Sequence, residues 1–212
     1  DRYSFGISTS VDGSELVHNN NRPYADGTGT FKKVINSVER VRKAGLQVGA
    51  IETTTRFSLN FPKEIVHTYV DMGFESIFIR PLTPLGKAAK SWEKIGYSSE
   101  EFIKFYQRAL DELIEINKAG RFIKEDHAAI LLRRIRGNFM NYMELRSPCG
   151  AGVGQLAYYA DGNIFTCDEG RMLHEMGQST FQLGNVYNNT YADLINNSAV
   201  SYTHLTLPTI LR

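Results

Sequence analysis

The sequence has few of the features that mark secreted or membrane proteins. It contains two cysteines among 212 residues, which argues against a disulfide scaffold in a domain this large. No apolar run approaches the roughly 20 residues of a membrane-spanning helix, and no charged segment followed by an apolar one opens the chain. The formal net charge of +1 gives no electrostatic reason to expect nucleic acid or an anionic membrane as partner. We therefore expect a globular cytoplasmic protein.

Strand and helix signals alternate between residues 5 and 120. Strands are expected at 5–11, 46–55 and 74–80, with helices starting at Phe31, Pro62 and Ser98 and a polar loop at 18–29. Thr30 is expected to cap the first of these helices, while Ser98 and Glu101 are spaced for a capping box. Successive β-then-α units imply parallel strands with right-handed crossovers. A doubly wound sheet and a (β/α) barrel both fit this pattern.

The pattern changes after Gly137, where we place a domain boundary that ends before Cys149. A further helix at 126–136 precedes it. Beyond it, residues 155–167 are typical of a β-hairpin with Asp161-Gly162 as its turn, and 191–197 predict one last helix.

Cys149 and Cys167 flank this hairpin, and nearby glycines would let the backbone fold closely around a bulky group. Thiolates are soft ligands that favour iron–sulfur clusters or zinc. Two cysteines complete neither kind of site, so buried free thiols and a hairpin disulfide stay open as alternatives.

The spacing of this pair resembles the start of a SPASM domain, the cluster-binding extension of radical S-adenosylmethionine (SAM) peptide maturases. The stretches that carry the resemblance are Gly150-Ala-Gly152, Tyr159-Ala-Asp-Gly162 and Leu183-Gly-Asn-Val186. In that family the two matching cysteines bind an auxiliary [4Fe–4S] cluster. The resemblance thus implies that Cys149 and Cys167 are metal ligands.

The upstream segment resembles the barrel of the same enzymes. Ser10-Val-Asp-Gly13 looks like the end of the fourth barrel strand, Thr53-Thr54 the end of the fifth, and the stretch from Ile79 to Ala88 the sixth. This favours an α/β fold made of the C-terminal half of a partial (β/α)6 radical SAM barrel, followed by the start of a small SPASM domain with a β-hairpin. The implied domains are 1–137 for the barrel and 138–199 for the SPASM segment.

The resemblance also implies roles for single residues. Ser10 and Asp12 would lie near the SAM ribose and carboxylate, and Thr54 at the end of the fifth strand. Arg22 and Arg80 could meet SAM or a peptide. Asp168 is the expected general base, because an Asp at this position in related sulfatase maturases is thought to take the proton from the substrate radical; a solvated turn residue is the alternative.

The sequence departs from the family in one important respect. The Cys-x3-Cys-x2-Cys motif that binds the SAM-cleaving cluster is absent. A truncated gene product or a degenerate paralogue used for binding would explain this. Residues 200–212 look like a translated sequencing adapter, which favours truncation; such a fragment is expected to be inactive alone.

The resemblance implies a complete enzyme that uses a 5′-deoxyadenosyl radical to modify a ribosomally made peptide or protein, with a reductant such as flavodoxin or ferredoxin. Gly150-Ala-Gly-Val-Gly154 and Cys167-Asp-Glu-Gly-Arg-Met172 look closest to maturases of the His-Xaa-Ser system. The alternatives are a non-catalytic α/β peptide-binding module with two structural cysteines, and a small zinc protein.

Overall fold

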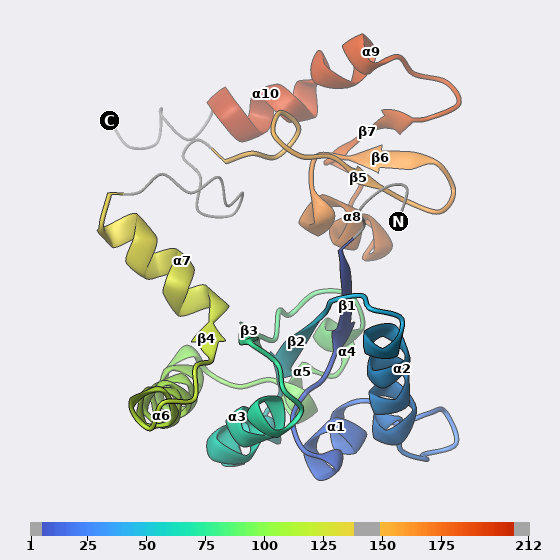
Figure 1. The fold of residues 1–212 in the computed structure, drawn as a ribbon. Coiled ribbons are helices and arrows are strands. Elements are labelled where there is room, and N and C mark those ends of the chain that lie inside the picture. Colours follow the sequence, from blue (N-terminus) through green and yellow to red (C-terminus); the bar gives the residue numbers. More distant parts are fainter. Residues whose placement is uncertain (1–5, 138–148, 206–212) are drawn as a thin grey trace. The chain divides into compact units, whose positions relative to one another are not determined.

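The computed structural model describes residues 6–137 and 149–205, with the side chains of 202–205 left out. The chain forms two compact units (Figure 1). The first comprises residues 1–84 and 91–132, and the second comprises 85–90 and 133–212. The predicted domains 1–137, 138–199 and 200–212 stay predictions.

A four-stranded parallel sheet organises the first unit. Its strands pair in chain order, with each strand hydrogen-bonded to the next: β1 (Ile7–Ser10), β2 (Val48–Thr54), β3 (Ser76–Pro81) and β4 (Lys124–Glu125). A doubly wound sheet would reverse its strand order at a switch point, whereas a barrel keeps the order of the chain. The parallel pairing and the order therefore agree with the barrel arc expected from the sequence.

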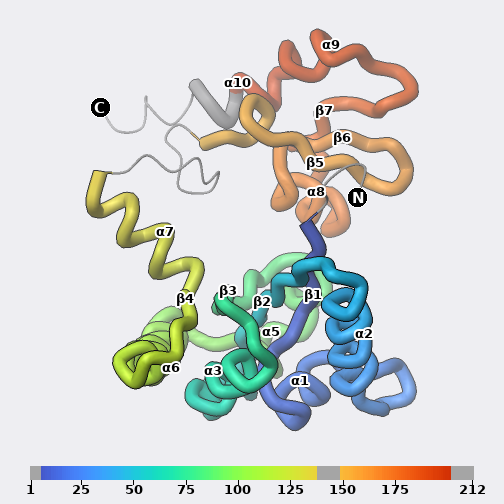
Figure 2. The backbone as a smooth tube through the Cα atoms, in the orientation of Figure 1, coloured from blue at the N-terminus to red at the C-terminus, as the bar shows by residue number. Residues whose placement is uncertain are grey.

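The helices of the first unit follow the strands along the chain, and some of them supply most of the apolar core. They are α1 (Glu15–Asn21), α2 (Phe31–Lys43), the short 3₁₀ helix η1 (Ser58–Asn60), α3 (Pro62–Asp71), α5 (Trp92–Ile95), α6 (Ser99–Lys118) and α7 (Asp126–Ile135). The tube trace shows each helix following its strand along the chain (Figure 2). Fully buried Ile77 and Ile79 of β3 share one core with Ile65 and Tyr69 of α3 and Phe105 of α6.

Two local expectations were wrong. Residues 18–21 are helical rather than loop, because α1 starts at Glu15 and continues through Asn21. Thr30 precedes α2 as expected but makes no side-chain cap; its hydroxyl instead donates to the carbonyl of Arg22 at 2.5 Å. A hydroxyl used to join two segments is not free to bond the first turn of its own helix.

The second unit is built around a small antiparallel sheet. Its elements are α4 (Lys87–Lys90), β5 (Ala157–Tyr158), β6 (Asn163–Phe165), α8 (Asp168–Glu175), β7 (Gln182–Asn185), α9 (Tyr191–Ile195) and α10 (Ser198–Leu205). The predicted hairpin is confirmed, since β5 and β6 pair antiparallel around a turn in which Gly162 has a φ of 87°. Buried Ile164, Leu183 and Leu194 form the core together with Ala199 and Val200.

No helix in the described part of the chain is both long and apolar enough to cross a membrane.

Candidate functional site

Asp12 follows β1 at the carboxyl edge of the parallel sheet and holds Arg22 in place. Its carboxylate is 1% exposed and accepts two bonds from the guanidinium, from Nε to Oδ2 at 2.7 Å and from Nη2 to Oδ1 at 3.2 Å. The backbone N–H of Thr53, near the end of β2, also donates to Oδ1 at 3.1 Å. A bidentate pair of this kind fixes the plane of the guanidinium as well as its position. The arginine is 38% exposed, so its outer edge faces solvent.

The ring of His18 holds the backbone on either side of this pair through hydrogen bonds. Its Nδ1 accepts the backbone N–H of Asp12 at 3.2 Å, and its Nε2 lies 3.1 Å from the hydroxyl of Thr30. Because that hydroxyl donates to the Arg22 carbonyl, it must accept from Nε2–H, which assigns the tautomer. Burial lowers the pKa of His18, which favours this neutral ring. The sequence pattern placed residue 18 at the start of a polar loop and did not predict the supporting role of His18.

Glu52 is a second buried acid near the same edge, on β2. It is fully buried, and its Oε2 accepts the hydroxyl of Thr54 at 2.8 Å. Its Oε1 has no hydrogen-bond partner in the part of the chain that the structure describes. Burial raises the pKa of the Glu52 carboxyl well above its usual value, with the nearby Asp12 charge acting in the same direction. Both effects favour the neutral form of the Glu52 carboxyl. Sequence reasoning missed this residue, although an acid inside an apolar strand is a visible signal.

Tyr97 joins the ends of two strands. Its hydroxyl donates to the carbonyl of Thr54, the last residue of β2, at 3.1 Å. The same oxygen accepts the backbone N–H of Leu82, directly after β3, at 2.6 Å. Burial raises the pKa of Tyr97 to about 12. A neutral tyrosine thus fixes the edge where ligands bind in parallel α/β folds.

The predicted SAM-binding residues all lie at this edge, but the structure links them unequally. Asp12 and Arg22 form one bonded pair, while Thr54 bonds Glu52 instead. Ser10 is the last residue of β1, and Arg80 lies in register with Thr53 near the end of β3. In the described residues no hydrogen bond joins Ser10 or Arg80 to the Asp12–Arg22 pair. The edge offers a hydroxyl, a carboxylate and two guanidinium groups, which suit the ribose and carboxylate of SAM.

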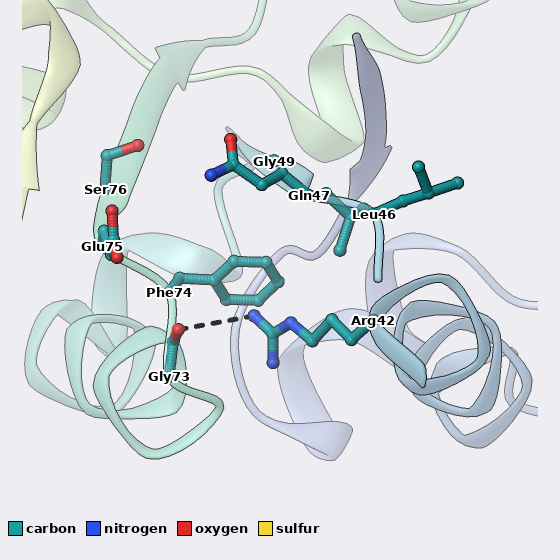
Figure 3. A pocket seen from close by; sticks show the side chains of 9 residues that line it. Arg42, Leu46, Gln47, Gly49, Gly73, Phe74, Glu75 and Ser76 are labelled. Atoms are coloured by element: carbon teal, nitrogen blue, oxygen red, sulfur yellow. Dashed lines mark hydrogen bonds between the residues drawn. The ribbon is translucent and has the colours of Figure 1, made fainter. Parts of the chain in front are cut away.

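The opposite edge of the sheet also carries a pocket, where β2 and β3 begin (Figure 3). Arg42 lies within it, with its guanidinium 4.6 Å from the ring centre of Phe74. The same group donates to the carbonyl of Met72 at 2.5 Å and to that of Gly73 at 3.4 Å. Arg42 therefore closes the end of α3, a structural role that is typical of this edge in barrels.

Cys149 and Cys167 line one pocket of about 380 Å³ in the second unit. Both are free thiols, half-buried. The pocket wall is mainly apolar, with Ala151, Leu173 and Phe181 among its residues. The structure thus brings the two predicted metal ligands to a common cavity. In the described residues no group of three or more His, Cys, Asp or Glu could hold a metal ion, so this pair supplies at most part of a ligand set.

Hydrogen bonds around Cys167 suit a thiolate ligand. The residue caps α8, and its Sγ accepts the backbone N–H of Gly170 at 3.4 Å and the hydroxyl of Thr166 at 3.8 Å. A Cβ at Gly170 would lie 2.8 Å from Phe181, so only glycine lets this amide approach. Burial raises the pKa of the Cys167 thiol, which keeps the free thiol protonated until a metal replaces the proton. Two thiols that line one apolar cavity suit part of the ligand set of an iron–sulfur cluster.

Asp168 and Glu169 both lie in the first turn of α8 rather than in an isolated turn. The carboxylate of Asp168 is 68% exposed and accepts Nε and Nη2 of Arg171, both at 2.9 Å. Glu169 instead lines the pocket that holds both cysteines. The expected general base is thus paired with Arg171, and of these two acids only Glu169 lines the thiol pocket.

The known proteins that the chain resembles match it at low sequence identity. No family model matches the chain. An uncharacterized protein of Methanothermobacter thermautotrophicus is 28% identical over 113 residues, which is 53% of this chain and 41% of that protein. The serine-type anaerobic sulfatase-maturating enzyme of Bacteroides thetaiotaomicron is 20% identical over 211 residues, covering 89% of this chain and 46% of that enzyme.

Solved structures of anaerobic sulfatase-maturating radical SAM enzymes resemble the chain over most of its length. Native anSMEcpe with bound AdoMet matches with a TM-score of 0.79 and 20% identity, covering 96% of this chain and 53% of that one. The same protein with bound AdoMet and Kp18Cys peptide matches with a TM-score of 0.77 and 20% identity, covering 96% and 54%. The chain spans about half the length of the relatives it matches. It therefore has the α/β fold of radical SAM maturating enzymes over about half of their length.

Proposed function

We propose that this chain is the part of a radical SAM maturase that contains the second half of the SAM-binding barrel and the start of an auxiliary cluster domain. The observation that carries the proposal is the shared pocket of Cys149 and Cys167, in a chain with the fold of anSMEcpe. The enzyme would modify a ribosomally made peptide or protein, as the peptide-bound neighbour suggests. A His-Xaa-Ser system maturase is the member of this class that we propose.

In the barrel half, Ser10, Asp12, Arg22, Thr54 and Arg80 are the proposed SAM contacts. The Asp12–Arg22 pair supports this role, because it holds a guanidinium edge at the end of the parallel strands where a ligand carboxylate can pair with it. Bound SAM would supply the radical that takes a hydrogen atom from the substrate. The chain's own residues would orient SAM and the peptide.

In the second unit, Cys149 and Cys167 would bind two irons of an auxiliary [4Fe–4S] cluster, which would accept an electron from the substrate radical. Asp168 is the proposed general base, because it directly follows the ligand Cys167 and its carboxylate reaches solvent. A small electron carrier of the flavodoxin or ferredoxin type would act as the reductant.

The test uses the complete enzyme that contains this chain, reconstituted with iron and sulfide under anaerobic conditions. Replacing Cys149→Ala or Cys167→Ala should remove up to about four iron atoms per chain, because each cubane is held by thiolates. Iron content and the visible absorption of the cluster measure this. Met176→Ala is a matched control that removes a sulfur from the end of α8 outside the pocket.

The result that would contradict the proposal is an unchanged iron content in both cysteine variants. In that case the cysteines are structural and the chain is a peptide-binding module of the same fold.

A further inference from the structure

A further cavity in the first unit has none of the proposed SAM contacts among its lining residues, and Asn21, Pro23 and Thr55 place it next to Arg22 and Thr54 in the chain. It has a volume of about 650 Å³. The end of α1, the turn and η1 after β2, and α5 contribute its walls, which comprise Asn20, Asn21, Pro23, Thr55, Arg56, Phe57, Asn60, Ser91, Lys94 and Ile95. These walls include two cations and no acidic side chain. We call this space the α1–α5 cavity.

Partly buried hydrogen bonds hold one wall of the α1–α5 cavity in place. The hydroxyl of Thr55 donates to the Oδ1 of Asn21 at 2.8 Å. The Nδ2 of Asn21 donates to the hydroxyl of fully buried Ser58 at 3.0 Å. These contacts fix the amide and the hydroxyl before any ligand arrives, which reduces the entropy lost on binding.

The two cations are brought to the same cavity by a backbone contact. The N–H of Arg56 donates to the carbonyl of Ile95 at 2.8 Å, and Lys94 is the preceding residue of α5. In the described part of the chain neither cation forms an ion pair with a carboxylate. The pKa of Glu101 is lowered chiefly because its carboxylate accepts the backbone N–H of Ser98, and the charge of Arg56 acts in the same direction as a smaller effect. The positive charge of the cavity is therefore available to an incoming anion.

The remaining walls suit a peptide better than a bare inorganic anion. Phe57, Ile95 and Pro23 offer apolar surface beside the cations. Asn20 and Asn60 add side-chain amides, which can donate to and accept from a peptide backbone. A phosphate ion would use the cations and leave the apolar wall uncovered.

We propose that the α1–α5 cavity binds an acidic peptide segment, with Arg56 and Lys94 pairing a carboxylate and the apolar wall covering the side chain beside it. The inference concerns binding by the first unit. It does not depend on a cluster at Cys149 and Cys167 or on radical chemistry, so it can fail or succeed separately from the proposed function.

The test measures fluorescence anisotropy of two labelled hexapeptides added to the chain at low salt. One alternates leucine and glutamate, and the other has glutamine in place of each glutamate. The acidic peptide should bind at least about tenfold more tightly, because only it can pair with the two cations. The double variant Arg56→Glu, Lys94→Glu should lose a similar factor for the acidic peptide and little for the neutral one.

Arg40→Glu is the matched control, because it reverses an exposed charge on α2 away from the cavity. Its affinity for the acidic peptide should stay close to that of the unchanged chain. Circular dichroism checks that each variant is folded. If the double variant does not fold, Lys94→Gln takes its place. A lower affinity of Lys94→Gln for the acidic peptide supports the proposal as well.

Three results would overturn the inference. The first is equal or absent binding of the two peptides, and the second is a loss in Arg40→Glu as large as in the cavity variants. The third is displacement of the labelled acidic peptide by inorganic phosphate at lower concentrations than by unlabelled acidic peptide, which would make the cavity a phosphate site.

Discussion

Asp12 is the residue on which the carboxyl edge of the sheet depends most directly. A carboxylate that is 1% exposed must be compensated, and here a guanidinium and a backbone N–H compensate it together. His18 adds a bond to the backbone of the same residue. The Ser-x-Asp-Gly pattern predicted that Asp12 matters. It could not predict the partner set, because the bond to Thr53 depends on how β2 lies against the end of β1.

Glu52 makes the stability of the first unit depend on pH, and the sign of this dependence follows from the direction of its pKa shift. Its native pKa is raised by burial, so the unfolded chain loses this proton first as the pH rises. The contribution is fully present below the unfolded pKa of about 4.3 and is lost as the pH rises toward the native pKa. Glu52→Gln keeps the size and shape of the side chain but removes the group that titrates. Urea unfolding should therefore show a smaller fall in stability between pH 5 and pH 8 in Glu52→Gln than in the unchanged chain.

Glu64→Gln serves as the control for this experiment, because Glu64 is exposed on α3 and should leave the pH dependence as it was. The lowered pKa of His18 acts with the opposite sign, destabilising the fold as the pH falls, and is common to all three proteins. If Glu52→Gln and the unchanged chain lose stability equally between the two pH values, Glu52 is not a neutral acid in the fold.

Long, strongly patterned elements are the ones that the sequence predicted well. The helix starting at Phe31 and the strand at 46–55 appear as α2 and β2, with ends shifted by a residue or two. Their apolar faces repeat over several turns or pairs, so a periodic pattern identifies them before tertiary contacts are known. The parallel order of the strands followed from the same alternation.

Three of the short elements were missed for a physical reason. The 7-residue α1, the 2-residue β4 and the 8-residue α8 present too few residues for a period to emerge. Each is stabilised by contacts outside itself. The carboxylate of Glu125 in β4 accepts the backbone N–H of Ile79, and the Asn21 amide at the end of α1 donates to the Ser58 hydroxyl. The ring centre of His174 in α8 lies 5.1 Å from that of Phe165 in β6. Such long-range partners cannot be read from local sequence.

The capping box of α6 gives a prediction at the level of this element. The Ser98 hydroxyl accepts the N–H of Glu101 at 3.2 Å, and the Glu101 carboxylate accepts the N–H of Ser98 at 2.7 Å. Ser98→Ala should reduce the free energy of unfolding by about 1 kcal/mol, because the first turn loses a bonded donor. Ser99→Ala is the neighbouring control with the same chemical change. Urea unfolding measures the loss of stability in each variant. Equal losses in the two variants would show that the capping box adds nothing to the stability of the fold.

At the scale of the whole molecule, the chain has two apolar cores that share no buried residue. The first combines a parallel sheet with helices, and it carries both the proposed SAM contacts and the α1–α5 cavity. The second is smaller and supports the pocket of the two cysteines. Val200 belongs to this second core and would lie 3.0 Å from a Cβ placed at Gly152, although residues 200–212 were predicted to be foreign to the protein. The sequence pattern indicated where the alternation of strand and helix signals stops. It did not indicate which residues complete the smaller core.

Separate cores predict separate unfolding transitions. Trp92, the single tryptophan of the chain, lies in the first unit, so its fluorescence reports that unit alone. Ile77→Ala should lower the stability seen by tryptophan fluorescence by about 2–5 kcal/mol, since it empties space in the first core. Ile164→Ala makes the same change in the second core and should leave the fluorescence transition in place, while a transition seen by far-UV circular dichroism moves to lower urea. A fluorescence midpoint that falls equally in both variants would mean that the two cores unfold as one cooperative unit.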